Sequence, residues 1–392
     1  MEVPVRYGVF FFGSVEMPDV LAGNPLPAGQ RRATRQQVWD ATEHLIDMGV
    51  RAEDLGYDSY WLAEHHFQHE GYEIVPNSLM LQSNLVARTQ RIQVGAMFNI
   101  VPQWHPLRLA EDFSTLLNLS GGRAVLGVGR GTVPRELRSL GLHQADMGYL
   151  ESEEKSKAID AHNREVFAEY MEVVRTALTN ETFSYKGKFF ELPPPDTNGP
   201  DGSVDTLTLL PGPLHPVEIW QAVTSPPTLG YAAEVGHGCV WWNQYHGFVR
   251  DQWERYAELY QQHHDVGLSS GAKRILVLPV HIADDHETAW RIGGAGHDEF
   301  WNLLAPFGWS RGYRGEDGKP AKPGLVPTLE QSTDQKMWAI GTPEEVAETV
   351  QFHKDSLGLE HLVIFPHFPG HTYAMAAEQM QRFREQVVPL LR

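Results

Sequence analysis

The sequence predicts an α/β protein, a single (β/α)8 (TIM) barrel over residues 1–392 that is enlarged by three long loop insertions. Short apolar runs alternate along the chain with longer segments whose apolar residues recur at helical spacing, as in parallel strands joined by crossover helices. Eight such runs can be placed, which suits a closed barrel better than a doubly wound open sheet. The first run, 5–12, is also not followed by a Gly-rich dinucleotide-binding turn.

The first half of the predicted barrel begins with the strand 5–12 and a long Pro- and Gly-containing loop, 13–37, which we expect to act as a lid or a packing arm. An amphipathic helix follows at 38–55 and ends at Gly56. The next units are expected as strands at 57–63, 92–101 and 123–129, helices at 76–89 and 107–119, a second insertion at 132–157 and a helix at 159–178.

The second half begins with a small hairpin, 183–191, and a Pro- and Gly-rich surface excursion, 193–213. The remaining elements are expected as strands at 217–223, 239–242, 274–282 and 362–365, helices at 225–236, 248–263, 342–357 and 373–390, and a third insertion at 293–337. The helix that begins at Thr342 has a capping residue, a proline and two acids in its first turn, which are typical start signals.

Composition excludes several classes of function. The formal net charge of -18 and the lack of a Lys/Arg cluster argue against a nucleic-acid partner. Cys239 is the single cysteine, so neither an intramolecular disulfide nor a Cys-based metal site is expected. The N-terminus lacks a signal-peptide pattern and no run of 18 apolar residues occurs, so we expect a cytoplasmic protein with no membrane association.

The stretch Glu64-His65-His66 stands directly after the predicted strand 57–63. In alternating β/α folds the active site lies at the C-terminal ends of the strands, so these side chains are candidates for acid–base chemistry. A histidine that titrates near neutral pH can move a proton. The alternative is that the three residues only cap a surface loop.

Two further strand exits carry groups that suit an anion. Gly127-Val128-Gly129-Arg130-Gly131 places a permanently charged guanidinium next to glycines that let the backbone approach a phosphate. Thr224-Ser225-Pro226-Pro227-Thr228 places hydroxyls at a helix N-terminus, although an ordinary N-cap needs only Ser225. Since both exits open on one face of the barrel, the pair predicts a phosphorylated cofactor there.

Four motifs in this order resemble those of the bacterial luciferase-like flavin-dependent monooxygenase family. They are Trp61-Leu62-Ala63-Glu64-His65-His66-Phe67, His105-Pro106-Leu107-Arg108-Leu109-Ala110-Glu111-Asp112, the glycine-rich stretch with Arg130, and Gly341-Thr342-Pro343-Glu344-Glu345. The resemblance covers most of the chain and implies a (β/α)8 barrel that binds reduced FMN, or the deazaflavin F420 in one branch. It also implies oxygenation of a small organic substrate by O2, with reduced flavin supplied by a separate reductase.

The resemblance also assigns roles to individual residues. His65 would be the catalytic histidine near the flavin, with Glu64 and His66 beside it. Arg130 would hold the flavin phosphate and Arg164 would be a second basic anchor. The remaining positions that would line the flavin are Met97 and Phe98, joined by a non-proline cis bond under the ring, and Val223, Thr224 and Ser225. Light-emitting members carry a cysteine at the position of Gly129, so light emission is not implied.

Aromatic residues near the strand ends, Phe98, Trp104, Trp241 and Trp242, would exclude water from the flavin, or would only pack the core. Adjacent strand residues point in opposite directions, so only one of Trp241 and Trp242 can face the site. The resemblance further implies a homodimer formed through the first two helices, including Trp39 and 76–88.

Three alternatives remain beside the FMN monooxygenase. F420-dependent hydride transfer needs the same phosphate arm and ring shelf, so the sequence does not separate the two cofactors. A non-catalytic flavin-binding barrel would not need to retain Glu64, His65 and Arg130 together. A metal-dependent hydrolase is disfavoured because adjacent histidines cannot easily both turn inward, and no metal site is predicted.

Overall fold

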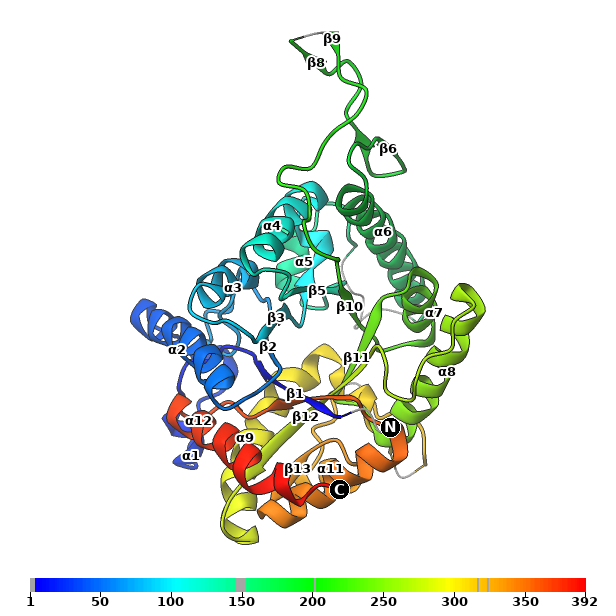
Figure 1. Cartoon of the computed structure of the whole chain (residues 1–392). Coiled ribbons are helices and arrows are strands. Elements are labelled where there is room, and N and C mark those ends of the chain that lie inside the picture. The colour runs from blue at the N-terminus through cyan, green and yellow to red at the C-terminus, as the bar shows by residue number, and fades with distance from the viewer. Residues whose placement is uncertain (1–3, 146–152, 201, 316, 323) are drawn as a thin grey trace.

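A computed structural model of the chain describes residues 4–145, 153–200, 202–315, 317–322 and 324–392 (Figure 1). Within these residues ten strands form the main sheet, of which β4 (Asn99–Ile100) and β13 (Ala339–Gly341) are short additions. The other eight are β1 (Arg6–Phe11), β2 (Ser59–Leu62), β3 (Gln93–Ala96), β5 (Ala124–Gly129), β10 (Ile219–Ala222), β11 (Gly238–Trp242), β12 (Arg274–Ile282) and β14 (His361–Phe365).

These eight strands close on themselves. Each pairs in parallel with its neighbours in chain order, β14 returns to β1, and β10 pairs with β5 to complete the ring. The (β/α)8 barrel predicted from the sequence is therefore confirmed. Its strands lie close to the predicted positions because an almost continuous apolar run is required wherever a strand is covered on both faces.

Helices surround the barrel, and all the principal ones except that at 286–304 correspond to helices expected from the sequence (Figure 1). They are α2 (Arg35–Asp54), α3 (Ser78–Val86), α4 (Pro106–Leu119), α6 (Glu153–Thr179), α7 (Pro226–Val235), α8 (His246–His264), α9 (His286–Leu304), α11 (Pro343–Leu357) and α12 (Tyr373–Arg382), which continues through the π-helical turn Phe383–Val387 and a 3-10 turn, Val388–Leu390. The predicted helix start at Thr342 forms a capping box, in which the Thr342 side chain accepts from the third helical N–H. A capping box that was not predicted forms at Thr34, so α2 begins three residues earlier than expected.

The long insertions contain more regular structure than the sequence suggested. The segment 13–37 forms α1 (Pro18–Leu21) and a 3-10 turn, Ala28–Gln30, and 132–157 contains α5 (Pro134–Leu140). Helix α6 begins at residue 153 and α9 continues to residue 304, so the expectation that regular structure would be absent from 132–157 and from 293 onward is wrong. The third insertion also contains two 3-10 turns, Ala305–Phe307 and Trp309–Gly312, and α10 (Leu329–Asp334).

Two hairpins project away from the barrel between α6 and β10 (Figure 1). The first pairs β6 (Tyr185–Lys186) with β7 (Glu191–Leu192), close to the predicted hairpin. The second pairs β8 (Asn198–Gly199) with β9 (Gly202–Ser203), inside the Pro- and Gly-rich stretch that was expected to be a surface excursion.

Aromatic rings fill the barrel interior near the C-terminal ends of the strands. Phe12 follows β1, and its ring centroid lies 5.0 Å from that of Trp242 and 5.2 Å from that of Phe365. Trp241 points the other way and packs on α8, with its ring centroid 5.1 Å from that of Trp253. The alternation expected for this pair is thus observed, with Trp242 as the inward residue.

Candidate active site

His65 lies just beyond the C-terminal end of β2 and is held by both ring nitrogens. Its Nδ1 is 3.1 Å from Oε1 of Glu136 on α5, and its Nε2 is 3.0 Å from Oε1 of Glu73 in the loop before α3. The two carboxylates are almost fully buried, whereas the side chain of His65 keeps 20% of its exposure. The ring also meets Phe12 edge to face at 6.4 Å, which places it beside the aromatic cluster.

Burial alone would lower the pKa of His65, but Glu73 and Glu136 outweigh it and raise the pKa from 6.5 to about 9. The expectation of a ring that titrates near neutral pH is therefore wrong. Burial also acts on the carboxylates: it raises the pKa of Glu73, while His65 and the His66 N–H outweigh it at Glu136 and lower that pKa. The two carboxylates thus favour the imidazolium form of His65.

Glu64 contacts the next strand instead of opening toward the barrel axis. Its carboxylate accepts hydrogen bonds from the side chain of Asn99 at 2.8 Å, the backbone N–H of Ile100 at 3.2 Å and Nε1 of Trp104 at 2.9 Å. Nε2 of His66 lies 3.5 Å from the same carboxylate, beyond hydrogen-bond geometry, and is buried without a hydrogen-bond partner. Glu64 therefore fixes β4 and leaves His66 with an unpaired ring nitrogen.

Arg130 and Arg164, the two predicted phosphate ligands, lie together. Arg130 Nη1 is 2.8 Å from Oδ1 of Asp160, and Arg164 pairs with Oδ2 of the same carboxylate. Arg130 directly follows β5, and the other two residues lie one turn apart on α6. Two guanidinium groups that converge on one carboxylate form a site with the charge and geometry to hold a phosphate.

The predicted non-proline cis peptide bond between Met97 and Phe98 is present and separates β3 from β4. The neighbouring strand β5 is close enough to this bulge to require glycines. A Cβ on Gly127 would overlap the carbonyl oxygen of Ala96, and one on Gly129 would lie 3.2 Å from Cβ of Phe98. The glycines before Arg130 thus serve the bulge as well as any bound phosphate.

Val223, Thr224 and Ser225 join β10 to α7. The backbone oxygen of Val223 accepts from the side chain of Gln244 at 3.1 Å, and Thr224 is exposed. Ser225 is the N-cap residue of α7, but its hydroxyl contacts the hydroxyl of Thr228 at 2.9 Å and caps no backbone N–H. An anion could therefore reach the hydroxyls of this helix start, although Pro226 and Pro227 provide no N–H groups there.

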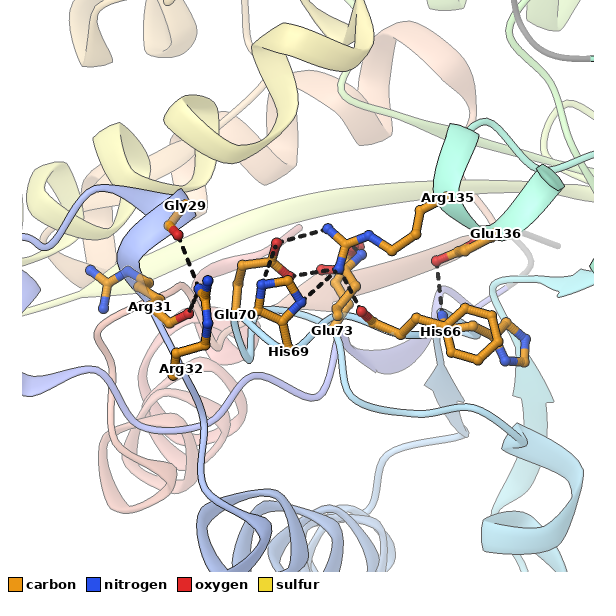
Figure 2. A network of polar contacts seen from close by, with 11 residues as sticks. Gly29, Arg31, Arg32, His66, His69, Glu70, Glu73, Arg135 and Glu136 are labelled. Atoms are coloured by element: carbon orange, nitrogen blue, oxygen red, sulfur yellow. Dashed lines mark hydrogen bonds and ion pairs between the residues drawn. The ribbon is translucent and has the colours of Figure 1, made fainter. Parts of the chain in front are cut away.

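Sequence reasoning missed Glu73, Arg135, Glu136 and Asp160. The last three lie in or near an insertion without readable periodicity, and Glu73 lies in a loop, so no local pattern distinguishes them from surface acids and bases. Arg135 and Glu136 reach from α5 to the loop after β2 (Figure 2). The only available signal was that Asp160 stands four residues before Arg164, the spacing of neighbours on one helix face.

Buried polar atoms near the strand ends lack partners of their own. Asn243, which follows β11 and is 3% exposed, has neither side-chain amide atom hydrogen-bonded, and the same holds for Gln103 beside Gly131. Nε1 of Trp242 and Oε2 of Glu136 are also unpaired. Unpaired buried groups are costly unless a ligand or water satisfies them, so this end of the barrel fits a ligand with several polar groups.

Residues 22–361 match the family model described as luciferase-like monooxygenase. The chain belongs to this family. It is 26% identical over 366 residues to the alkanal monooxygenase alpha chain of Photobacterium leiognathi, covering 90% of this chain and 94% of that protein. It is equally 26% identical over 366 residues to the F420-dependent glucose-6-phosphate dehydrogenase of Amycolatopsis mediterranei, covering 89% of this chain and 94% of that protein.

Solved structures confirm the barrel at lower sequence identity. The type II Baeyer-Villiger monooxygenase that is the oxygenating constituent of 3,6-diketocamphane monooxygenase from Pseudomonas putida, solved with FMN, superposes with a TM-score of 0.73 at 20% identity and covers 100% of this chain and 99% of that one. An F420-dependent secondary alcohol dehydrogenase, solved with an F420–acetone adduct, gives 0.64 at 14% identity, with 99% of each chain covered.

The described residues contain neither a metal-binding cluster nor a membrane-spanning helix. No group of three or more His, Cys, Asp or Glu side chains is arranged to hold a metal ion. Among the helices described, none is long and apolar enough to cross a membrane.

Proposed function

We propose that this member of the luciferase-like monooxygenase family binds reduced FMN and uses O2 to oxygenate a small organic substrate, with the reduced flavin delivered by a separate reductase. The observation that carries the proposal is the convergence of Arg130 and Arg164 on one carboxylate at the end of β5. The alkanal monooxygenase relative supports the reaction class.

Each part of the site has a role in this proposal. Arg130 and Arg164 hold the phosphate, assisted by the hydroxyls of Thr224 and Ser225. The Met97–Phe98 bulge supports the ring, and Val223 lies along it. Bound reduced flavin would supply the electrons that activate O2.

The aromatic cluster around Phe12 and Trp242 keeps water from the barrel end at which the strands have their C-termini. The raised pKa of His65 favours its doubly protonated form at neutral pH. His66 offers an unpaired ring nitrogen, and Glu64 keeps β4, and hence the bulge, in place. We place the protein in the cytoplasm, as a homodimer formed through α2 and α3.

F420-dependent hydride transfer is the second candidate, because an F420-dependent relative is as similar to this chain as the alkanal monooxygenase. Both cofactors carry a phosphate, so the arginine pair serves either one. Binding measurements therefore have to determine whether the Met97–Phe98 bulge supports the ring of FMN or that of F420.

Arg130→Ala tests the phosphate assignment. Loss of a hydrogen bond to a charged group should weaken FMN binding by about 1.5 to 3 kcal/mol, measured by anaerobic titration of the reduced flavin. Arg250→Ala is the matched control, because it removes a half-exposed arginine from α8 on another part of the surface. Unchanged affinity for both FMN and F420 in Arg130→Ala would show that the phosphate lies elsewhere.

A further inference from the structure

His65 meets a carboxylate at each ring nitrogen, and this arrangement limits its protonation state. A neutral imidazole has one N–H and can donate to one acceptor only, whereas an ionised carboxylate accepts and does not donate. When the ring carries two protons, Nδ1 donates a hydrogen bond to Glu136 at 3.1 Å, and Nε2 forms an ion pair with Glu73 at 3.0 Å. With both carboxylates ionised, this arrangement favours the imidazolium.

Glu136 connects both histidines to α5. Its Oε1 accepts from Nδ1 of His65 and, at 2.8 Å, from the backbone N–H of His66. The side chain is 1% exposed, so these bonds are little weakened by competing water. One carboxylate oxygen therefore sets both the orientation of the His65 ring and the path of the backbone at His66.

Helix α5 is itself attached to the same loop by the residue before Glu136. Arg135 pairs with Oε1 of Glu70 at 2.7 Å and with its Oε2 at 3.0 Å, and it donates to the backbone oxygen of Phe67 (Figure 2). The position of Glu136 relative to His65 is consequently fixed by a second set of charged bonds, which involves neither His65 nor His66.

We propose that Glu136 is a positioning residue of this site, which holds His65 in one orientation with both nitrogens protonated and so makes it a proton donor, not a base, at neutral pH. The charged groups that face His65 are Glu64, Glu73 and Glu136, while Phe12, which follows β1, is apolar. The catalytic meaning of this arrangement rests on the proposed function. The protonation state itself does not.

Nuclear magnetic resonance of the imidazole rings across pH tests the proposal in the full-length protein without cofactor. His65→Gln identifies the His65 signals by their loss. In the wild type these signals should titrate near pH 9, and in Glu136→Gln the midpoint should fall by about 1 to 3 pH units because one facing charge is removed. Glu111→Gln is the control: it removes an exposed carboxylate of α4 that pairs with Arg108 and does not touch His65, and it should leave the midpoint unchanged.

The pH profile of turnover gives a second readout that a purely structural role would not move. The pH at which turnover falls on the alkaline side should be lower in Glu136→Gln than in the wild type, in parallel with the midpoint of the His65 signals. Glu136→Asp should bring this pH part of the way back to the wild-type value. A wild-type midpoint at the ordinary value of about 6.5, or an unchanged midpoint in Glu136→Gln, would overturn the proposal.

If Glu136→Gln does not fold, Glu73→Gln replaces it. This variant removes the carboxylate at Nε2 and keeps every bond to α5, so its midpoint must also fall, and an unchanged one would overturn the imidazolium assignment. A protein that shows the expected titration but binds neither reduced FMN nor reduced F420 would contradict the proposed function and leave the positioning role of Glu136 intact.

Discussion

Replacing Asp160 with Asn should tighten the binding of FMN. In the structure the Asp160 carboxylate forms ion pairs with both Arg130 and Arg164, so a phosphate that binds the two arginines has to displace it. The three side chains are 18%, 33% and 36% exposed for Arg130, Arg164 and Asp160, and partly exposed pairs of this kind are weakened by solvent. At roughly 0.2 to 1 kcal/mol for each of the two pairs, the exchange costs about 0.4 to 2 kcal/mol, and its removal should lower the dissociation constant roughly 2- to 30-fold.

Anaerobic titration of the wild type and Asp160→Asn with reduced FMN measures this difference. Riboflavin is the control ligand, because it lacks the phosphate and its affinity should be the same in both proteins. Tighter riboflavin binding would mean that the substitution acts on the ring site. Equal or weaker FMN binding in Asp160→Asn would refute the reasoning, since Asp160 would then orient the arginines and not compete with the phosphate.

Three further predictions concern stability and assembly. The folded-state pKa of His65 lies above its unfolded value, so the contribution of His65 to the free energy of unfolding, about 3 kcal/mol, is complete below pH 6.5 and is lost as pH rises through about 9. Urea unfolding of wild type and His65→Gln across this window should show the stability difference between the two proteins shrinking. A constant difference would contradict the raised pKa. Gly127→Ala should cost about 3 kcal/mol in the same assay because a Cβ there overlaps Ala96, whereas Gly230→Ala in α7, where a Cβ meets nothing within 4 Å, should be neutral or slightly stabilising. Trp39 is 58% exposed on α2, and Trp39→Glu should convert a dimer to a monomer in light-scattering mass measurements; a wild-type monomer at micromolar concentration would remove the dimer.

The barrel was predictable because its strands are defined by local composition. An apolar run such as the one that forms β5 is needed wherever helices cover one face of a strand and the barrel interior the other. The Met97–Phe98 cis bond and the proximity of Arg164 to Arg130 were expected from family resemblance, and the structure contains both. Their functional roles stay predictions.

The partners of His65 were not predictable from the sequence. Glu73 and Glu136 stand 8 and 71 positions away from it, and only the fold brings both carboxylates to one ring. The error in the expected pKa follows directly, because a histidine with no identified neighbours is assigned its ordinary value. Asp160 was missed for the same reason, since its significance depends on an arginine that lies thirty positions earlier.

The direct test of the central claim is an anaerobic titration of the purified protein with reduced FMN and, in parallel, with reduced F420, followed by mixing of each complex with O2 in a stopped-flow instrument. The proposed function predicts that reduced FMN binds more tightly than reduced F420, that Arg130→Ala weakens this binding, and that bound reduced FMN is oxidised by O2 at a rate different from that of free FMN. Tight binding of reduced F420 with no measurable binding of reduced FMN would contradict it and establish the hydride-transfer alternative.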